Sequence, residues 1–175
     1  MRLHKNVALV GMMGAGKTSL GRRLAARLEV PFRDADHEIE AAASLTVSEI
    51  FEKFGEPYFR DGERRVIARL LNEPAHVLAT GGGAYMDLAT RTAMKQNAFT
   101  IWLKAPVAFL VSRVRKRDTR PLLRNGDLKE TIEKLLAVRE PVYAEADMTL
   151  EYDDETHSEA LDGIIEALTA RGLVT

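Results

Sequence analysis

The sequence predicts an α/β fold in which helices cover both faces of a central parallel sheet of five strands. Two observations support this prediction. Five short apolar segments alternate with longer segments of helical periodicity, which is typical of strand–helix–strand units. The chain has 175 residues, 46% of them hydrophobic and 29% charged, so it can form one ordinary core. We therefore expect a single domain over residues 1–175, built as a three-layer α/β/α sandwich.

The expected strands are short apolar runs, and the expected helices repeat apolar residues every three or four positions. The strands are Asn6–Val10, Pro31–Asp34, His76–Thr80, Phe99–Leu103 and Asp147–Tyr152. The helices are Lys17–Leu28, Asp36–Ala43, Val47–Phe54, Pro57–Leu71, Asp87–Lys95, Pro106–Arg117, Leu128–Glu145 and His157–Ala170. Ligands in such folds bind at the carboxyl ends of the strands. The polar motifs of this chain fall at those ends or on the following helices.

A glycine-rich loop with the sequence GMMGAGKTS joins the first strand to the first helix at residues 11–19, here called the phosphate loop. It has the form G-x-x-x-x-G-K-[ST], which cradles phosphates with backbone N–H groups in front of a helix N-terminus. We expect Lys17 to reach the β- and γ-phosphates of ATP and Thr18 to offer its hydroxyl to Mg²⁺. The expected ATP-binding residues of the loop are Gly11, Gly14, Ala15, Gly16, Lys17, Thr18 and Ser19.

The elements on either side of the phosphate loop support this interpretation. The run Val7–Val10 before it is typical of a buried parallel strand. After the loop, Leu20, Leu24 and Leu28 repeat every four residues, as on one face of an amphipathic helix. Strand, loop and helix therefore follow one another in the order that a P-loop requires.

Two carboxylates, Asp34 and Asp36, end the second expected strand. Residues two apart lie on one face of an extended chain. One carboxylate could then serve Mg²⁺ directly or through water, and the other could orient an alcohol or accept its proton. The alternative is that the pair caps the helix that follows.

Further polar and glycine-rich segments follow later in the chain. Arg60 and Glu63 are neighbours on one helix surface, either as a plain ion pair or as a guanidinium held ready to bind a carboxylate. The three glycines Gly81–Gly83 follow an apolar strand, which suggests that a ligand approaches bare backbone there. A basic, weakly patterned segment at about residues 113–127 suggests a mobile lid.

The composition narrows the possible functions. The net charge of −1 argues against a nucleic-acid surface. The chain has no cysteine, which removes disulfides and thiolate catalysis and fits a reducing compartment. No signal-peptide pattern and no apolar run of membrane-spanning length occur. We therefore expect a cytoplasmic protein without a membrane or nucleic-acid partner, most simply a monomer.

In order and spacing, the motifs together resemble the shikimate kinases from about Asn6 to Asp147. The matching segments are GMMGAGKTSLGRRLA from Gly11, FRDAD at 32–36, IE at 39–40, EIF at 49–51, GEPYFR at 55–60, GGG at 81–83, RPLL at 120–123 and REPVY at 139–143. The resemblance implies an enzyme that moves the γ-phosphoryl group of ATP to the 3-hydroxyl of shikimate, with Mg²⁺, in aromatic amino-acid biosynthesis.

The resemblance also implies roles for individual residues. Asp34 is expected to reach Mg²⁺ through water, and Asp36 to hold the shikimate hydroxyls as a catalytic residue together with Lys17 and Arg120. Arg120 is the lid arginine that folds over ATP, and Arg113 is expected near the adenine. The implied shikimate-binding residues are Asp36, Phe51, Phe59, Arg60, Gly81, Gly82, Gly83 and Arg139.

Two departures from the family pattern stand out. The family usually has glycine at the position of Ser44, and residues 153–157 lack the proline expected in an adenine-binding turn, so no adenine contact is assigned there. Two other functions compete with shikimate phosphorylation. One is a gluconate kinase of the same fold, which the two arginines and the RPLL segment disfavour. The other is a catalytically weak accessory protein that binds nucleotide.

Overall fold

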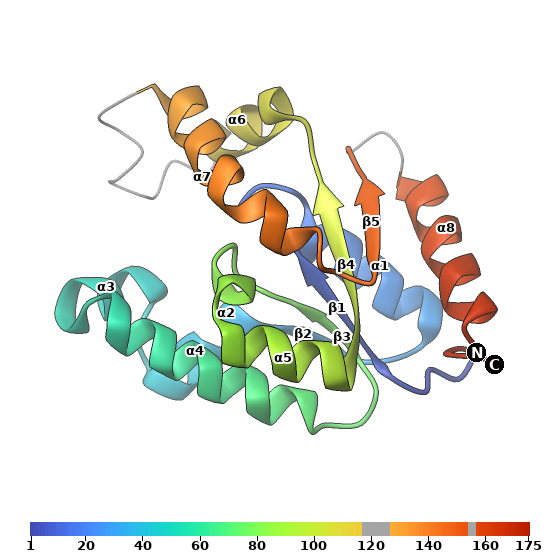
Figure 1. Ribbon diagram of the computed structural model, residues 1–175. Helices are drawn as coiled ribbons and strands as arrows, with labels where there is room; N and C mark the ends of the chain where they lie inside the picture. The colour runs from blue at the N-terminus through green and yellow to red at the C-terminus, as the bar shows by residue number, and fades with distance from the viewer. Residues whose placement is uncertain (117–126, 154–156) are drawn as a thin grey trace.

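The computed structural model describes residues 1–116, 127–153 and 157–175. Its centre is a parallel sheet of five strands in the order β2-β3-β1-β4-β5 (Figure 1). The strands are β1 Asn6–Val10, β2 Phe32–Asp34, β3 Val77–Ala79, β4 Ala98–Lys104 and β5 Met148–Glu151. Because β1 lies between β3 and β4, the loop that follows it opens where the strand order changes direction. The predicted fold class is confirmed.

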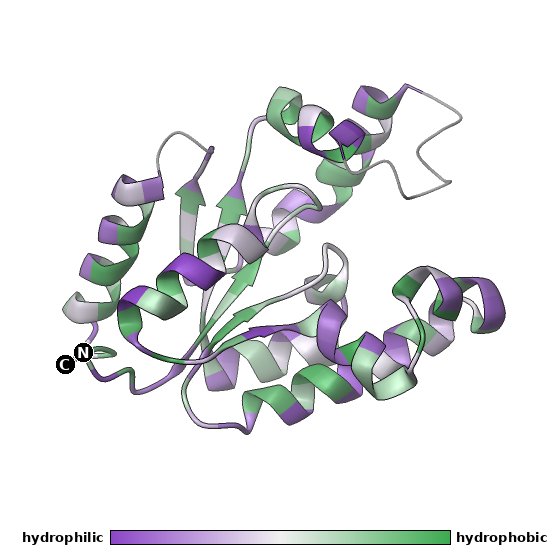
Figure 2. Ribbon diagram, turned by 180° about the vertical axis from the view of Figure 1, so that it is seen from behind, coloured by the Kyte–Doolittle hydropathy of each residue, from purple (hydrophilic) through white to green (hydrophobic). Residues whose placement is uncertain are grey.

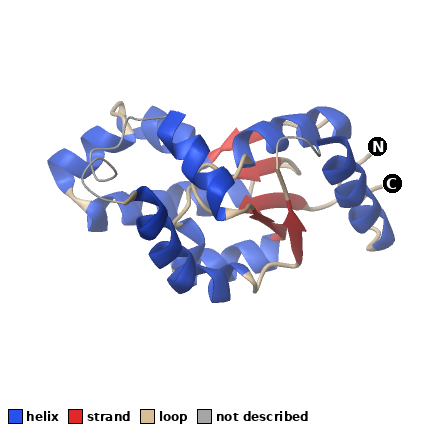
Figure 3. Cartoon of the chain, turned by 90° about the horizontal axis from the view of Figure 1, so that it is seen from above, coloured by secondary structure: helices blue, strands red, loops and turns tan. Residues whose placement is uncertain are grey.

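Helices occupy both sides of the sheet (Figures 1 and 3). They are α1 Lys17–Leu28, α2 Ala35–Ala43, α3 Val47–Phe54, α4 Glu56–Leu71, α5 Leu88–Asn97, α6 Val107–Lys116, α7 Leu128–Tyr143 and α8 His157–Ala170, with a short 3₁₀ helix, η1, at Ala84–Met86. Helices α1 and α8 lie side by side on one side of the sheet, and α5 lies on the other side (Figure 1). None of the helices that the structure describes is long and apolar enough to cross a membrane.

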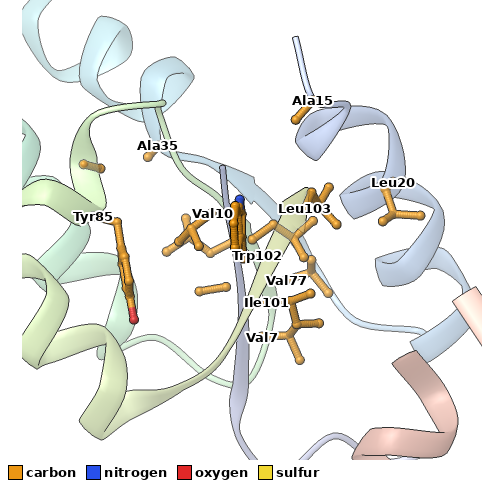
Figure 4. Close-up of a cluster of buried hydrophobic side chains, with 14 of the residues drawn as sticks. Val7, Val10, Ala15, Leu20, Ala35, Val77, Tyr85, Ile101, Trp102 and Leu103 are labelled. Atoms are coloured by element: carbon orange, nitrogen blue, oxygen red, sulfur yellow. The ribbon is translucent and has the colours of Figure 1, made fainter. Parts of the chain in front are cut away.

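The core is formed mainly by the central strands and the helix faces that cover them. All five residues of β1 are buried, and β1 and its neighbours β3 and β4 are hydrophobic along most of their length (Figure 2). Leu20 of α1 packs from one side of the sheet and Tyr85 of η1 from the other (Figure 4). This buried centre gives the loops at the carboxyl ends of the strands a rigid support.

The described boundaries of the expected strands and helices lie within two residues of the sequence-based expectation, and the small shifts at two helix starts have local causes. Helix α2 begins at Ala35, because Asp34 caps it by accepting hydrogen bonds from two following N–H groups. Helix α4 begins at Glu56, with Pro57 in its first turn, where a proline needs no N–H partner. The sequence pattern did not predict η1, which follows directly after the glycines at 81–83.

Ser44 ends α2 in a left-handed conformation, with a φ of 53°. A side chain is disfavoured there, whereas glycine adopts this conformation freely. We expect Ser44→Gly to raise the free energy of unfolding by about 0.5–1 kcal/mol, measured by urea denaturation. The matched control is Ser48→Gly within α3, which should lower stability because glycine is a poor helix former. Equal effects of the two changes would contradict the assignment of strain to Ser44.

Asp87, at the start of α5, forms hydrogen bonds with both α5 and α4. It caps α5 through the N–H of Thr90 and accepts two hydrogen bonds from Arg64, at 3.1 and 2.9 Å. The Arg64 guanidinium holds the pKa of Asp87 well below its ordinary value of 3.8. A carboxyl group with a lowered pKa stabilises the folded protein at pH values above its ordinary pKa. This contribution is lost as the pH falls from the ordinary pKa toward the lowered one. We therefore expect Asp87→Asn to cost about 1 kcal/mol at pH 7, and progressively less as the pH falls below 3.8 in acid titrations of stability.

Candidate functional site

The phosphate loop leaves β1 and turns into α1 through three glycines with positive φ: Gly11 at 142°, Gly14 at 81° and Gly16 at 97°. Two of them also lack room for a side chain. A Cβ on Gly11 would lie 2.7 Å from the carbonyl oxygen of Leu103, and one on Gly16 would lie 2.8 Å from the ring of Tyr152. Backbone conformation and close packing therefore both explain the glycine spacing of the motif.

Lys17 begins α1, with Gly16 as the N-cap, and 8% of it is exposed. Its Nζ donates to the carbonyls of Gly11 at 2.6 Å and Met12 at 2.8 Å, so the ammonium group lies across the loop. Ala15 is buried and its N–H donates to Met12, which closes the turn. Ser19 is partly exposed in the first turn of α1.

The structure corrects the expected geometry of the two carboxylates. Asp36 lies in the first turn of α2 and not on an extended strand beside Asp34. Asp34 Oδ1 accepts hydrogen bonds from the N–H groups of Asp36 at 3.0 Å and His37 at 3.3 Å, while Oδ2 accepts one from Thr18 Oγ1 at 2.9 Å. Asp34 therefore both caps the helix and binds the loop threonine, and α2 carries Asp36 toward the site.

A polar cavity of about 100 Å³, here called the phosphate cavity, lies over the loop. It is lined by Met13, Gly14, Gly16, Lys17, Thr18, Asp34, Asp36, Thr80, Gly81 and Gly82. Residues from the ends of β1, β2 and β3 thus meet at one edge of the sheet, as expected from the positions of their motifs. Both predicted carboxylates line this cavity even though they do not share a strand face.

A second cavity of about 60 Å³, here called the acceptor cavity, adjoins the first. It is lined by Met13, Asp36, Val47, Phe51, Phe59, Arg60, Glu63, Gly81, Gly82, Gly83 and Arg139. Phe51 and Phe59 form one wall, with ring centroids 4.7 Å apart. Asp36 and the first two glycines of the turn Gly81–Gly83, here called the glycine turn, line both cavities. The two cavities therefore meet at Asp36.

The acceptor cavity is lined by an ion pair between a partly buried arginine, Arg60, and a buried glutamate, Glu63. Arg60 Nη1 donates to Glu63 Oε1 at 2.8 Å, and its Nε lies 3.5 Å from Glu56. Burial lowers the pKa of Arg60, but the two carboxylates outweigh it and raise the pKa above its ordinary value. Glu63 is only 2% exposed, and burial raises the pKa of its carboxyl against the opposing effect of Arg60. Glu63 thus fixes the guanidinium of Arg60 at the cavity wall.

The glycine turn packs against the two arginines of the acceptor cavity. A Cβ on Gly83 would lie 2.5 Å from Arg60 Nη2, and one on Gly82 would lie 3.2 Å from Arg139 Nη1. One on Gly81 would lie 3.0 Å from Asp36 Oδ1. Side chains at these positions would fill the space in which the arginines and the carboxylate lie, which explains why three successive residues lack them.

Two predicted residues stand apart from this group. Arg113 lies on α6, where its Cβ is 3.2 Å from the position of a Cβ on Gly14, so it packs beside the phosphate loop. Arg120 and most of the predicted lid at 113–127 lie outside the described residues.

Sequence reasoning missed two buried tyrosines that contact site glycines. Tyr143 donates a hydrogen bond to the carbonyl of Gly82, and the ring of Tyr152 packs on Gly16. A signal existed for Tyr143, since it follows Arg139 by four residues and therefore lies on the same helix face. Tyr152 follows β5 directly and has no comparable signal in the sequence.

A phosphate loop at the switch point of a small parallel sheet, with a polar cavity that adjoins a second cavity carrying two arginines, defines a P-loop kinase of small molecules. The family model described as shikimate kinase matches residues 13–169. The chain belongs to the shikimate kinase family.

Individual relatives agree with this assignment. A shikimate kinase of Caulobacter vibrioides is 54% identical over 164 residues, which cover 94% of this chain and 82% of that relative. The solved structure of shikimate kinase from Acinetobacter baumannii in complex with shikimate is 38% identical, with a TM-score of 0.91 over 97% of this chain and 95% of that one. A gluconokinase from Sinorhizobium meliloti is 14% identical, with a TM-score of 0.58 over 98% and 99% of the two chains, and so shares only the fold.

Proposed function

We propose that this protein transfers the γ-phosphoryl group of ATP to the 3-hydroxyl of shikimate, giving shikimate 3-phosphate and ADP. The position of Asp36, which lines both the phosphate cavity and the acceptor cavity, is the observation that carries this proposal. In phosphoryl transfer, the bond from the γ-phosphorus to ADP breaks, a bond to the acceptor oxygen forms and the hydroxyl proton is released, so the acceptor hydroxyl must lie next to the γ-phosphate. A carboxylate that lines both cavities lies where the two substrates would meet.

Charge and position account for the proposed chemistry. Lys17, at the start of α1, neutralises negative charge on the transferring group, and Arg120 is the second cation expected there. Asp36 accepts the hydrogen bond of the attacking hydroxyl and thereby aligns its oxygen with the γ-phosphorus. The walls of Phe51 and Phe59 limit water in the acceptor cavity, which disfavours hydrolysis of ATP.

The residues of the phosphate loop fit a bound Mg²⁺ ion. The hydroxyl of Thr18 and the carboxylate of Asp34 are 2.9 Å apart, and oxygen donors of this kind suit a hard cation that is also held by substrate phosphates. We propose that Thr18 binds the ion directly and Asp34 through water. When bound, the ion would neutralise part of the negative charge on the β- and γ-phosphates of ATP.

Arg60 and Arg139 are proposed to bind the shikimate carboxylate from two helices. Lysine keeps the charge at either position but loses the planar two-point contact. We expect Arg139→Lys to lower kcat/KM for shikimate by a factor that corresponds to a loss of about 1.5–3 kcal/mol of transition-state stabilisation. ATP binding should be nearly unchanged, and steady-state kinetics measure both.

Two comparisons sharpen this prediction. Arg65→Lys, at an exposed arginine on α4, is the matched control and should have little effect. Shikimate methyl ester lacks the carboxylate charge, so it should be a poor substrate of the unmodified enzyme and lose little more with Arg139→Lys. Equal losses with the ester and with shikimate would mean that Arg139 does not bind the carboxylate.

A coupled assay of ADP release tests the proposed function directly. We expect turnover with shikimate and little with gluconate. Turnover with gluconate alone would favour the polyol-acid kinase, and nucleotide binding without turnover on either would favour the accessory protein. We further propose that the chain acts as a single domain and a monomer in the cytoplasm, which light scattering and fractionation would check.

A further inference from the structure

A buried tyrosine on α7 is hydrogen-bonded to the glycine turn. Tyr143 is fully buried, and its hydroxyl donates to the carbonyl oxygen of Gly82, 61 residues away in the chain. Gly82 lines both cavities of the site, whereas Tyr143 lines neither. The hydroxyl therefore acts on the site from outside both cavities, through the carbonyl of Gly82 and through the side chain of Arg139, with which it also interacts.

The tyrosine side chain is itself held in place. Its ring packs against Trp102 of β4, with ring centroids 5.7 Å apart. Burial raises the pKa of the Tyr143 hydroxyl above its ordinary value of 10.0, so the group keeps its proton at neutral pH and can donate. The contact with Trp102 on β4 therefore holds the Tyr143 ring in place. Its protonated hydroxyl is then a fixed hydrogen-bond donor for the carbonyl of Gly82.

The hydrogen bond to the carbonyl of Gly82 orients the whole peptide group that follows it. The carbonyl of Gly82 and the N–H of Gly83 belong to one planar peptide group, so fixing the oxygen also fixes the direction of the N–H. Three successive glycines would otherwise sample many conformations, and that freedom would be lost on ligand binding. A restraint on the middle of the turn reduces this cost before the substrate arrives.

The same helix positions the arginine of the site. Arg139 lies four residues before Tyr143, on the same face of α7. Its Nη1 lies 3.2 Å from the position of a Cβ on Gly82 and 3.7 Å from Met12 Sδ. The tyrosine therefore binds the turn to the helix at the point where Arg139 and the turn pack together.

We propose that Tyr143 is a positioning residue for the acceptor substrate, which orients the Gly82–Gly83 peptide and keeps it in register with Arg139. The proposal rests on the proposed function, since the acceptor is taken to be shikimate. The competing explanation is that the hydroxyl only stabilises the fold. The two differ in what they predict for substrate affinity.

Tyr143→Phe removes the hydroxyl and keeps the ring against Trp102. We expect it to raise KM and Kd for shikimate about three- to tenfold and to leave KM for ATP within about twofold. The matched control is Tyr85→Phe. Tyr85 is equally buried in η1, next to the same turn, and its ring points into the core (Figure 4). Tyr85→Phe should change neither KM, whatever it does to stability.

Assays at 15 °C with a thermal unfolding curve for each variant separate folding from positioning. If Tyr143→Phe does not fold, Trp102→Phe, which loosens the ring contact, should shift KM for shikimate in the same direction by less. A lowered melting temperature with unchanged KM and Kd for shikimate would overturn the inference. An equal rise in KM for shikimate and in KM for ATP would also overturn it.

The activity of the unmodified chain distinguishes failure of this inference from failure of the proposed function. Its inactivity on shikimate would overturn the proposed function and this inference together, whereas its normal activity beside an unaffected variant would overturn this inference alone.

Discussion

Replacing Lys17 with methionine is expected to lower turnover by about a hundredfold or more, the scale for loss of one preorganised charge at a reacting centre. The ammonium group lies across the phosphate loop at the start of α1, within the cavity that is proposed to hold the transferring phosphoryl group. Methionine keeps much of the length and apolar body of the side chain but has no charge. The effect should therefore appear mainly in kcat, measured by the coupled ADP assay.

The fold must remain intact for this result to be interpreted. Lys17 donates to two loop carbonyls, so a thermal unfolding curve of the variant is required. Lys95→Met is the matched control, because Lys95 is a partly exposed lysine on α5 that pairs with Glu145. Near-normal turnover by a folded Lys17→Met variant would exclude a role of Lys17 in the transfer.

Asp36→Asn is expected to reduce turnover to a similar extent while leaving the affinity for an ATP analogue nearly unchanged. Asparagine keeps the shape of the side chain and removes the charge that accepts the hydrogen bond of the acceptor hydroxyl. Asp36 lies where the two cavities meet, so the loss should appear in the transfer step and in shikimate binding. Steady-state kinetics and calorimetric titration with the analogue measure the two quantities separately.

The neighbouring carboxylate provides the contrast. Asp34 binds Thr18 of the phosphate loop and caps α2, and it does not line the acceptor cavity. Asp34→Asn should therefore weaken Mg²⁺-dependent nucleotide binding more than shikimate binding, and asparagine still caps a helix. A large loss of nucleotide affinity with preserved turnover in Asp36→Asn would reverse the two assignments.

Local signals in the sequence predicted the fold well. The alternation of apolar runs and helical periods depends on residues that are close in sequence, and it predicted a parallel sheet of five strands. It did not predict the strand order β2-β3-β1-β4-β5, which depends on contacts between distant segments. The error at Asp34 and Asp36 shows where such reasoning fails. A spacing of two fits both a strand and a helix start, and only the hydrogen bonds from Asp34 to the following N–H groups decide between them.

The site was predictable where one motif forms one contact. The phosphate loop and the pair of Arg60 and Glu63 are local in sequence, and the structure contains both. The contact of Tyr143 with Gly82 joins residues that are far apart in the chain, and it depends on how α7 packs against η1 and the glycine turn. The packing of Tyr152 on Gly16 is of the same kind. Local sequence patterns do not show which residues from distant segments come into contact in this way.

The position of the phosphoryl group in the product tests the central proposal most directly. The purified chain is incubated with ATP, Mg²⁺ and shikimate, and the product is analysed by phosphorus and proton NMR. We predict one phosphate ester, on the 3-oxygen of shikimate, formed in equal amount with ADP. ADP formed without a shikimate ester, or an ester on another hydroxyl, would contradict the proposed arrangement of Asp36 between the two cavities.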